Sequence, residues 1–413
     1  MHLRSIGIRS KLFIVVGVAA AVLIASGWLA MLFIAREVLS TQERSIMHSW
    51  AWRNAASLCA IMLGLILGPA AGRADTDYPV TEGDVVVHDI TFRDGERLES
   101  LTLHYTALGA PRRDGGGRIV NAVLVLHGAT GTGKSFLAPS LAGALFGAGQ
   151  PLDAQRYYIV LPDGIGAGGS SKPSDGLRSH FPHYGYLDQV ETQHRLLEGL
   201  GIDHLRLVSG ISQGGMQTWL WGERYPDAMD GLLPIASMPM EISGRNLLWR
   251  RMIMRAIEHD PGWRGGDYDA AQPPTQWMET AAPMFALMVG NANRIQAEAP
   301  DRAATLAYFD RLVAQFRGRD AADTYYDFDS SRDYNPAPDL GLIKAPLLAI
   351  NFTDDMVNPA EFAQTRQAIE RLPQGRLLMV SPEPMGYGHG AIFHASLWAA
   401  PLGEFLEALP VRR

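Results

Sequence analysis

Six short apolar runs, each bounded by turn residues and separated from the next by a helical pattern, constrain the fold of this chain more than any other feature. Alternation of this kind is typical of a parallel sheet whose strands are joined by helical crossovers. Two further runs come earlier and are joined through the turn residues Asp94 and Gly95. The sequence therefore predicts an α/β fold with a mostly parallel sheet flanked by helices. The six runs are residues 122–126, 157–161, 205–209, 231–236, 346–350 and 377–380, and the two earlier ones are 85–90 and 101–106.

A long excursion, residues 238–340, separates the fourth run from the fifth. We expect it to be an inserted helical cap over the carboxyl edge of the sheet, between a first core part at 76–237 and a second at 341–413. Its amphipathic pieces are 247–258, 278–288 and 302–316. The large apolar side chains of the cap either admit a substrate or only pack the cap onto the sheet, and they are Trp249, Trp277, Met278, Met284 and Phe285.

Residues 1–75 form an N-terminal membrane or signal region rather than part of the expected core. No charged residue occurs in 12–35, which is long enough to cross a bilayer as a helix. A second apolar run, 54–72, ends in small residues and is typical of a signal peptide with its cleavage site, which makes Met47 a plausible start. The two interpretations conflict, because two spanning helices return the core to the cytoplasm whereas a start at Met47 exports it. We favour export, to the periplasm or outside the cell, over a membrane anchor.

Charge and cysteine content exclude several functions. The chain has 36 Lys+Arg against 43 Asp+Glu, a formal net charge of −7, so nucleic acid is not an expected partner. The single cysteine, Cys59, excludes an intrachain disulfide and a cysteine-rich zinc site.

Two glycine-rich segments match nucleotide-binding patterns. Residues 128–135, Gly-Ala-Thr-Gly-Thr-Gly-Lys-Ser, satisfy the P-loop pattern after an apolar strand. No clear acidic magnesium-binding strand accompanies them, so we prefer a glycine-rich loop and keep a P-loop protein as the alternative of a different class. Residues 164–169 satisfy a dinucleotide pattern, but the Ser-Ser-Lys-Pro that follows cannot open a helix cleanly, which predicts a loop.

A third glycine motif, Gly210-Ile-Ser212-Gln-Gly214, stands between an expected strand and an expected helix that ends before Pro226. In a nucleophile elbow the chain turns so sharply that the serine is held strained at the tip, and the residues two before and two after it must be glycine. This setting predicts that Ser212 is a nucleophile.

A serine hydroxyl needs a base, and the base needs a carboxylate that fixes its tautomer. Asp354 and Asp355 follow the run 346–350, and His389 follows the run 377–380. The order serine, aspartate, histidine, each at the carboxyl end of an expected strand, is the α/β-hydrolase order. The residues alone leave the choice between the two aspartates open. A metal site built from these side chains lacks further ligands, so we expect no metal and no cofactor.

Longer motifs run from about residue 121 to the C-terminus and cover nearly the whole expected core and cap. Through them the chain resembles the homoserine O-acetyltransferase branch of the α/β-hydrolases. The matching segments are Phe-Pro at 181–182 with 188–193, Gly-Ile-Ser-Gln-Gly-Gly-Met-Gln at 210–217 with 224–227, Asp-Pro-Gly-Trp at 260–263 with 264–268, 328–331, and Gly-His at 388–389.

The resemblance implies an α/β-hydrolase fold with a helical cap, and a role for each residue of the site. Ser212 would accept the acyl group and His389 would be the general base. Asp355 would be the orienting acid, since the family's acid lies four residues before a proline, here Pro359.

The resemblance also implies an oxyanion hole formed by the backbone N–H groups of Ala129 and Gln213. Two departures from the family bear on the substrate. Gly390 stands where the acetyltransferases have an aspartate that holds the amino group of homoserine, and Arg294 lacks the segment that surrounds their carboxylate-binding cap arginine.

These points predict a serine-dependent acyl hydrolase, esterase-like, that acts on a small ester through an acyl-Ser212 intermediate. An acyl-CoA-dependent O-acyltransferase that resembles homoserine O-acetyltransferase is the alternative. The expected partners are a small-molecule ester or acyl donor and a second copy of the chain in a homodimer. A membrane is expected to be contacted only through the N-terminal segment.

Overall fold

In the computed structural model of this protein, residues 78–383 and 385–410 are described. A sheet of eight strands forms the centre of this part, in the order β1-β2-β4-β3-β5-β6-β7-β8. The hairpin β1-β2 and the pair β2-β4 are antiparallel, and the remaining neighbours are parallel. The strands are β1 Val80–Thr91, β2 Arg97–Leu108, β3 Ala122–Leu126, β4 Tyr158–Pro162, β5 Leu207–Ile211, β6 Leu232–Ile235, β7 Leu347–Phe352 and β8 Gly375–Val380.

The predicted fold class is confirmed, because each of the six apolar runs forms a strand of the parallel part. Strands β3, β4 and β5 are buried along their whole length, since helices cover both faces of the sheet. The two earlier strands are longer than predicted. In β1 exposed and partly buried residues alternate. Because its exposed residues are polar, the apolar run in the sequence is shorter than the strand at both ends.

Helices cover the two faces of the core. α4, α5 and α11 pack on one face through a cluster that includes Trp219 and Ile369. α3 and α12 pack on the other face through a cluster that includes Leu145 and Phe405. The helices are α3 Pro139–Leu145, α4 Tyr186–Gly199, α5 Gln213–Arg224, α11 Ala363–Glu370 and α12 Ala399–Ala408.

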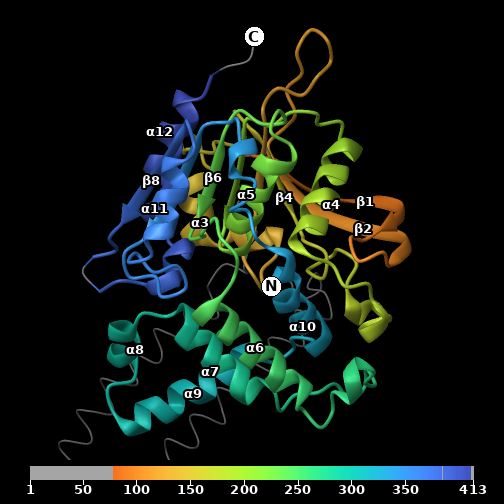
Figure 1. Cartoon of the computed structure of the whole chain (residues 1–413), viewed down its shortest axis with the longest axis vertical. Helices are drawn as coiled ribbons and strands as arrows, with labels where there is room; N and C mark the ends of the chain where they lie inside the picture. The colour runs from red at the N-terminus through yellow and green to blue at the C-terminus, as the bar shows by residue number, and fades with distance from the viewer. Residues whose placement is uncertain (1–77, 384, 411–413) are drawn as a thin grey trace, which may run out of the picture. The chain divides into compact units, whose positions relative to one another are not determined.

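The insertion between β6 and β7 forms helices with an apolar cluster of their own, which Figure 1 shows as a group on one side of the sheet. The base of this cap is closed by a hydrogen bond in which the Tyr334 hydroxyl donates to the Met238 carbonyl oxygen at 2.7 Å. The cap helices are α6 Gly244–Glu258, α7 Met278–Val289, α8 Ala292–Glu298, α9 Arg302–Phe316 and α10 Ala321–Asp329.

Short 3₁₀ helices complete the described part. They are η1 Gly133–Leu137, η2 Pro173–Asp175, η3 Arg178–His180, η4 Arg264–Gly266, η5 Ser330–Asp333, η6 Leu340–Leu342, η7 Gly388–Phe393 and η8 Ala395–Leu397.

The predicted N-terminal features, the apolar run 12–35, the signal peptide at 54–72 and the start at Met47, lie outside the described residues. Within residues 78–383 and 385–410, every helix is too short or too polar to span a bilayer.

Candidate active site

The turn between β5 and α5 holds Ser212 at the carboxyl edge of the sheet. Ser212 has a φ of 53°, in a region that residues other than glycine rarely adopt, and its N–H donates to the Ile235 oxygen at 2.9 Å. A Cβ on Gly210 would lie 2.3 Å from the carbonyl carbon of Gly214, and one on Gly214 would lie 2.2 Å from the Leu126 oxygen. This close approach of backbone segments explains why both positions are glycine.

His389 lies in η7, in the loop that follows β8, and its side chain reaches Ser212. The distance between His389 Nε2 and Ser212 Oγ is 2.7 Å. His389 is 4% exposed, so both ring nitrogens are largely shielded from water. The two residues are separated by 177 positions in the chain, and the fold brings them into hydrogen-bonding contact.

Asp355 follows β7 and contacts the other nitrogen of the same ring. Its Oδ2 lies 2.8 Å from His389 Nδ1, and the Val357 N–H donates to its Oδ1 at 2.7 Å. Burial alone would raise the pKa of this carboxyl, but the His389 imidazole and the hydrogen bonds from Asn358 and Val357 lower that pKa below its ordinary value. Asp355 is therefore a carboxylate that favours an Nδ1–H tautomer of His389, which leaves Nε2 free to take a proton from Ser212.

The two adjacent aspartates have different contacts. The Oδ2 of Asp354 accepts hydrogen bonds from the Tyr387 N–H at 2.9 Å, the Gly388 N–H at 2.6 Å and the Asn291 side chain at 2.9 Å. Asp354 therefore holds the loop that leads into His389 and joins it to the N-cap of α8, whereas Asp355 contacts the imidazole itself.

Gln213 directly follows Ser212 in the chain, and Ala129 belongs to a loop that passes beside the serine. Gln213 opens α5, so the helix provides no acceptor for its N–H. Ala129 belongs to the loop after β3, residues 127–132, which we call the β3 loop. A Cβ on Gly128 would lie 3.4 Å from the Ser212 Cβ, so this loop passes directly beside the serine.

His127 holds the start of the β3 loop. Its Nδ1 lies 2.9 Å from the Gly128 oxygen, and the Gly164 N–H donates to its Nε2 at 2.9 Å. The ring therefore ties the β3 loop to the loop after β4.

The two other glycine-rich segments serve as loops. Lys134 of the P-loop pattern pairs with Glu82 of β1, with Nζ and Oε2 2.8 Å apart. Residues 164–169 form turns, as predicted. Asp163 accepts hydrogen bonds from the Gly133 N–H at 2.7 Å and the Gly169 N–H at 2.8 Å, so one carboxylate joins both segments.

Asn358 is part of the site, although no sequence argument pointed to it. Its side chain donates to Asp355 Oδ2 at 3.0 Å and to the Ala236 oxygen at 2.8 Å, and it lies 3.4 Å from His389 Nδ1. The only hint in the sequence is its place directly before Pro359 in the segment that follows the carboxylates.

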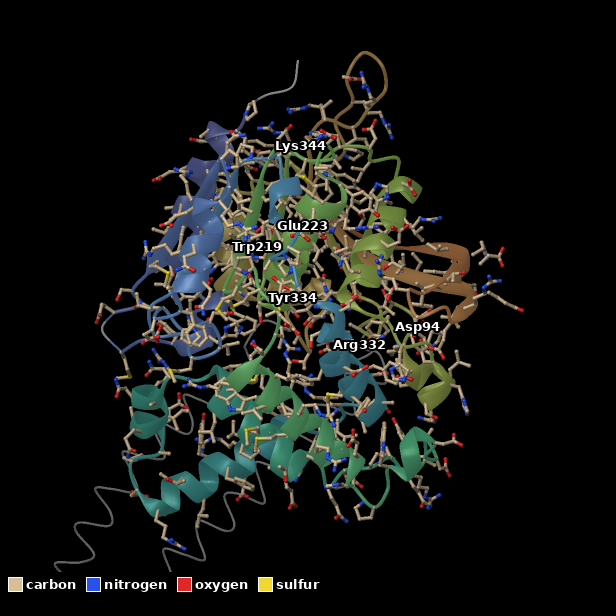
Figure 2. The ribbon with its side chains drawn as sticks, viewed as in Figure 1. Asp94, Trp219, Glu223, Arg332, Tyr334 and Lys344 are labelled. Carbon is tan, nitrogen blue, oxygen red and sulfur yellow. The ribbon has the colours of Figure 1, made fainter. Side chains whose placement is uncertain are left out.

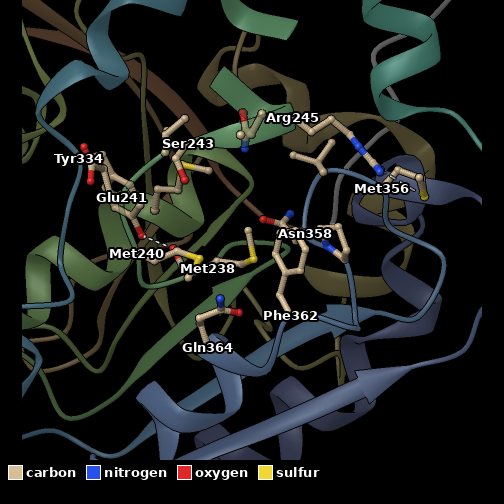
Figure 3. Close-up of a pocket in the computed structure, with 16 residues that line it drawn as sticks. Met238, Met240, Glu241, Ser243, Arg245, Tyr334, Met356, Asn358, Phe362 and Gln364 are labelled. Atoms are coloured by element: carbon tan, nitrogen blue, oxygen red, sulfur yellow. Dashed lines mark hydrogen bonds between the residues drawn. The ribbon is translucent and has the colours of Figure 1, made fainter. Parts of the chain in front are cut away.

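A pocket of about 220 Å³ lies beside this group, with four methionines in its lining (Figure 3). Asn358 lines it, but Ser212 and His389 do not, so the pocket lies next to the reacting groups rather than over them. Its methionines are Met216, Met238, Met240 and Met356.

The large apolar side chains of the cap pack against one another. Trp277 and Met278 are buried in the apolar cluster of the cap, and Trp249, Met284 and Phe285 pack against that cluster. Of the two interpretations of these side chains, the structure favours the packing role.

Within residues 78–383 and 385–410, no group of three or more histidine, cysteine, aspartate and glutamate side chains is arranged to hold a metal ion.

Residues 121–383 match the family model described as the alpha/beta hydrolase fold, which is more than half of the chain. The chain belongs to the α/β-hydrolase family. This α/β-hydrolase is similar in sequence to homoserine O-acetyltransferases. The enzyme of Haemophilus influenzae is 29% identical in an alignment 343 positions long, which covers 75% of this chain and 94% of that protein. The enzyme of Chlorobaculum parvum is 31% identical in an alignment 303 positions long, which covers 66% of this chain and 80% of that protein.

Solved structures agree on the fold of this α/β-hydrolase. The homoserine O-acetyltransferase of Bacillus anthracis superposes with a TM-score of 0.71 at 20% identity, over 81% of this chain and 99% of that one. An acetylester hydrolase of Corynebacterium glutamicum superposes with a TM-score of 0.68 at 22% identity, over 80% of this chain and 96% of that one. The protein is thus a homoserine O-acetyltransferase-like α/β-hydrolase, and an enzyme of the acyltransferase and hydrolase class.

Proposed function

We propose that this enzyme transfers a short acyl group from an ester or thioester to a small acceptor through an acyl-Ser212 intermediate. The observation that carries the proposal is the unbroken contact from Ser212 Oγ to His389 Nε2 and from His389 Nδ1 to Asp355 Oδ2. A serine in this setting can lose its proton to the ring while it attacks a carbonyl carbon.

Each half of the reaction uses the same groups. Ser212 Oγ bonds to the carbonyl carbon, its proton moves to His389 Nε2, and the carbonyl oxygen becomes an oxyanion that the N–H groups of Ala129 and Gln213 stabilise. The proton then passes to the leaving group as its bond to carbon breaks. An acceptor hydroxyl then gives its proton to His389 Nε2 as its oxygen attacks the acyl-Ser212 carbonyl carbon. The bond between that carbon and Ser212 Oγ breaks, and His389 returns the proton to Oγ.

The acceptor distinguishes two candidate functions. The relatives in sequence carry the name homoserine O-acetyltransferase, which supports transfer to the hydroxyl of a small molecule as the first candidate. This reverses the order expected from the sequence alone, where hydrolysis came first.

Transfer to water is the second candidate, and two observations favour it. A Cβ at Gly390 would meet no atom within 4 Å, so the position next to His389 is open space without a side-chain acceptor for an ammonium group. Arg294 donates to the Gly386 oxygen at 3.0 Å and lies 4.1 Å from the Tyr387 ring centroid, so it braces the loop before His389. An amino-acid acceptor would need partners for both of its charges. We therefore infer that homoserine is a poor acceptor in either case.

We also propose that the enzyme is exported, with membrane contact only through its N-terminal segment. The apolar sequence of residues 54–72 and its small-residue end support this proposal. The mass of the mature chain, isolated from the membrane-free fraction of its host, tests it, and a chain that retains residues 1–46 would contradict it.

The acceptor question is tested with acetyl-CoA and p-nitrophenyl acetate as donors. Product release is measured with water alone and with homoserine or uncharged alcohols added. Acetylated alcohol that forms faster than free acetate supports the first candidate, and release that no alcohol changes supports the second. A Ser212→Ala protein with full activity would contradict both.

A further inference from the structure

The cap reaches into the core at one residue of the β3 loop. The Thr130 N–H donates to Asp327 Oδ2 at 2.7 Å, although the two residues are 197 positions apart. Asp327 lies on α10, which Figure 1 shows between the sheet and the other cap helices. A second cap residue, Arg319, donates from its guanidinium to the Thr130 oxygen at 3.3 Å. Both backbone polar groups of Thr130 are therefore held by cap side chains.

Thr130 needs such support because its backbone is strained. Its φ is 61°, a value that costs free energy for a residue with a Cβ. The turn is also closed locally by the bond from the Gly131 N–H to the Gly128 oxygen, at 3.0 Å. Thr130 directly follows Ala129, so the bond to the Thr130 N–H fixes the peptide plane on the carboxyl side of Ala129 and restrains the backbone that carries the Ala129 N–H.

The same carboxylate also contacts the other side of the site. The Gln213 side chain is 1% exposed and lies near enough to Asp327 to lower the pKa of its carboxyl. Burial raises the pKa of the Asp327 carboxyl above its ordinary value, while the Thr130 N–H acts in the opposite direction. Burial of this acid is therefore unfavourable for its charged form, yet the acid lies between the two segments that carry the Ala129 and Gln213 N–H groups.

We propose that Asp327 and Arg319 form a clamp on the β3 loop, and that Asp327 is the positioning residue that sets the spacing of the Ala129 and Gln213 N–H groups. The inference rests on the proposed acyl-Ser212 chemistry, in which these two N–H groups hold the oxyanion. Asp327 itself touches no reacting atom, and it acts through Thr130 and Gln213.

The test compares Asp327→Ala and Asp327→Asn with Asp329→Ala and Asp329→Asn. Asp329 lies on the same helix and accepts from His183 and Arg332, away from the β3 loop. The assay is p-nitrophenyl acetate turnover, with active enzyme counted by fluorophosphonate titration. We expect Asp327→Ala to lower kcat about 10- to 100-fold with little change in KM, which is less than the loss of an oxyanion donor outright. Asp327→Asn keeps an oxygen that can accept from Thr130, so it should recover most of kcat, and the Asp329 variants should match wild type.

Inhibition by a trifluoromethyl ketone distinguishes a role in oxyanion binding from a role in stability alone. The ketone forms a tetrahedral adduct with the serine, so its inhibition constant should rise in Asp327→Ala by the factor that kcat/KM falls. If Asp327→Ala does not fold, Arg319→Met tests the same clamp, with a smaller loss of kcat expected. An unchanged kcat, or a lower kcat with unchanged inhibitor affinity, would overturn the clamp. Wild-type enzyme that the fluorophosphonate does not label would instead overturn the proposed function.

Discussion

At the scale of single residues, the site separates two carboxylates that are adjacent in the chain. Asp355 contacts His389 Nδ1, and Asp354 accepts from two N–H groups of the loop that carries His389. The residues alone left this choice open, because both side chains follow the same strand. The choice was decided by a resemblance in the spacing to Pro359, and the geometry of the loop then explains what the second aspartate does.

We expect Asp355→Asn to lower kcat by about 10³- to 10⁴-fold, because an amide cannot hold the imidazole in the required tautomer or stabilise its charged form. Asp354→Asn should lower kcat far less, since the amide oxygen can still accept from the Gly388 N–H. Steady-state ester turnover by the two purified variants measures the difference. A larger loss in Asp354→Asn would show that the wrong carboxylate has been assigned to His389.

Glu223 gives a prediction about stability rather than activity. This side chain, labelled in Figure 2, lies inside the core near Tyr334, and burial together with Asp339 raises its pKa to about 8 from an ordinary value of 4.5. The folded protein keeps the proton up to about pH 8, whereas the unfolded chain releases it near pH 4.5. The free energy of unfolding should therefore fall as pH rises through this window, by on the order of 4 kcal/mol.

Glu223→Gln removes this titration. We expect the variant to be more stable than wild type at pH 8 and close to it at pH 4.5, as measured by urea unfolding at both values. An equal response of the two proteins to pH would rule out Glu223 as the source of the dependence.

At the scale of elements, the strands could be predicted well and the cap less well. Buried parallel strands are continuous apolar runs, so β3 was placed with its observed ends. β5 was placed two residues early, because Leu205 was counted as the first residue of the apolar run, although it makes only an isolated bridge to Met229 and Arg206 separates it from the strand. α10 was not predicted, because acidic and aromatic residues interrupt the apolar periodicity of a helix in this segment. The sequence feature that indicates its start is the N-cap residue Asp320.

The glycine-rich segment around η1 allows a prediction that separates a loop from a P-loop. Lys134→Ala removes an ion pair with Glu82 whose partners are both exposed, so activity should stay within about twofold and stability within about 1 kcal/mol of wild type. Calorimetric titration should detect no ATP binding to wild type. Micromolar ATP binding that is lost in Lys134→Ala would restore the P-loop interpretation.

At the scale of the whole described part, the cap helices expose large apolar side chains. Leu248 of α6, Leu287 of α7 and Leu306 of α9 are 64%, 61% and 58% exposed. We expect a second copy of the chain to cover part of this surface in a homodimer.

Sedimentation velocity checks this expectation. Wild type should sediment as a dimer, and Leu248→Asp combined with Leu287→Asp should sediment as a monomer. Leu342 lies outside the cap, in η6, and is 53% exposed, so Leu342→Asp is the matched control and should leave the dimer intact. A wild-type protein that is monomeric at all concentrations would contradict the homodimer.

The hydrogen bond between Tyr334 and Met238 has a consequence for engineering by recombination. Because it holds the two ends of the insertion together, the segment between them can be cut out at one place and exchanged for the corresponding segment of a relative. The cap and the core are also joined at other places, however, since Asn291 contacts Asp354 and Asp327 contacts Thr130. A chimera that keeps the core residues and replaces the insertion would keep Ser212 in its turn, but it would lose both of these contacts where the donor lacks equivalent side chains. Donor segments for such chimeras should therefore be chosen by whether they carry an acid and an amide at these two positions, before overall similarity is considered.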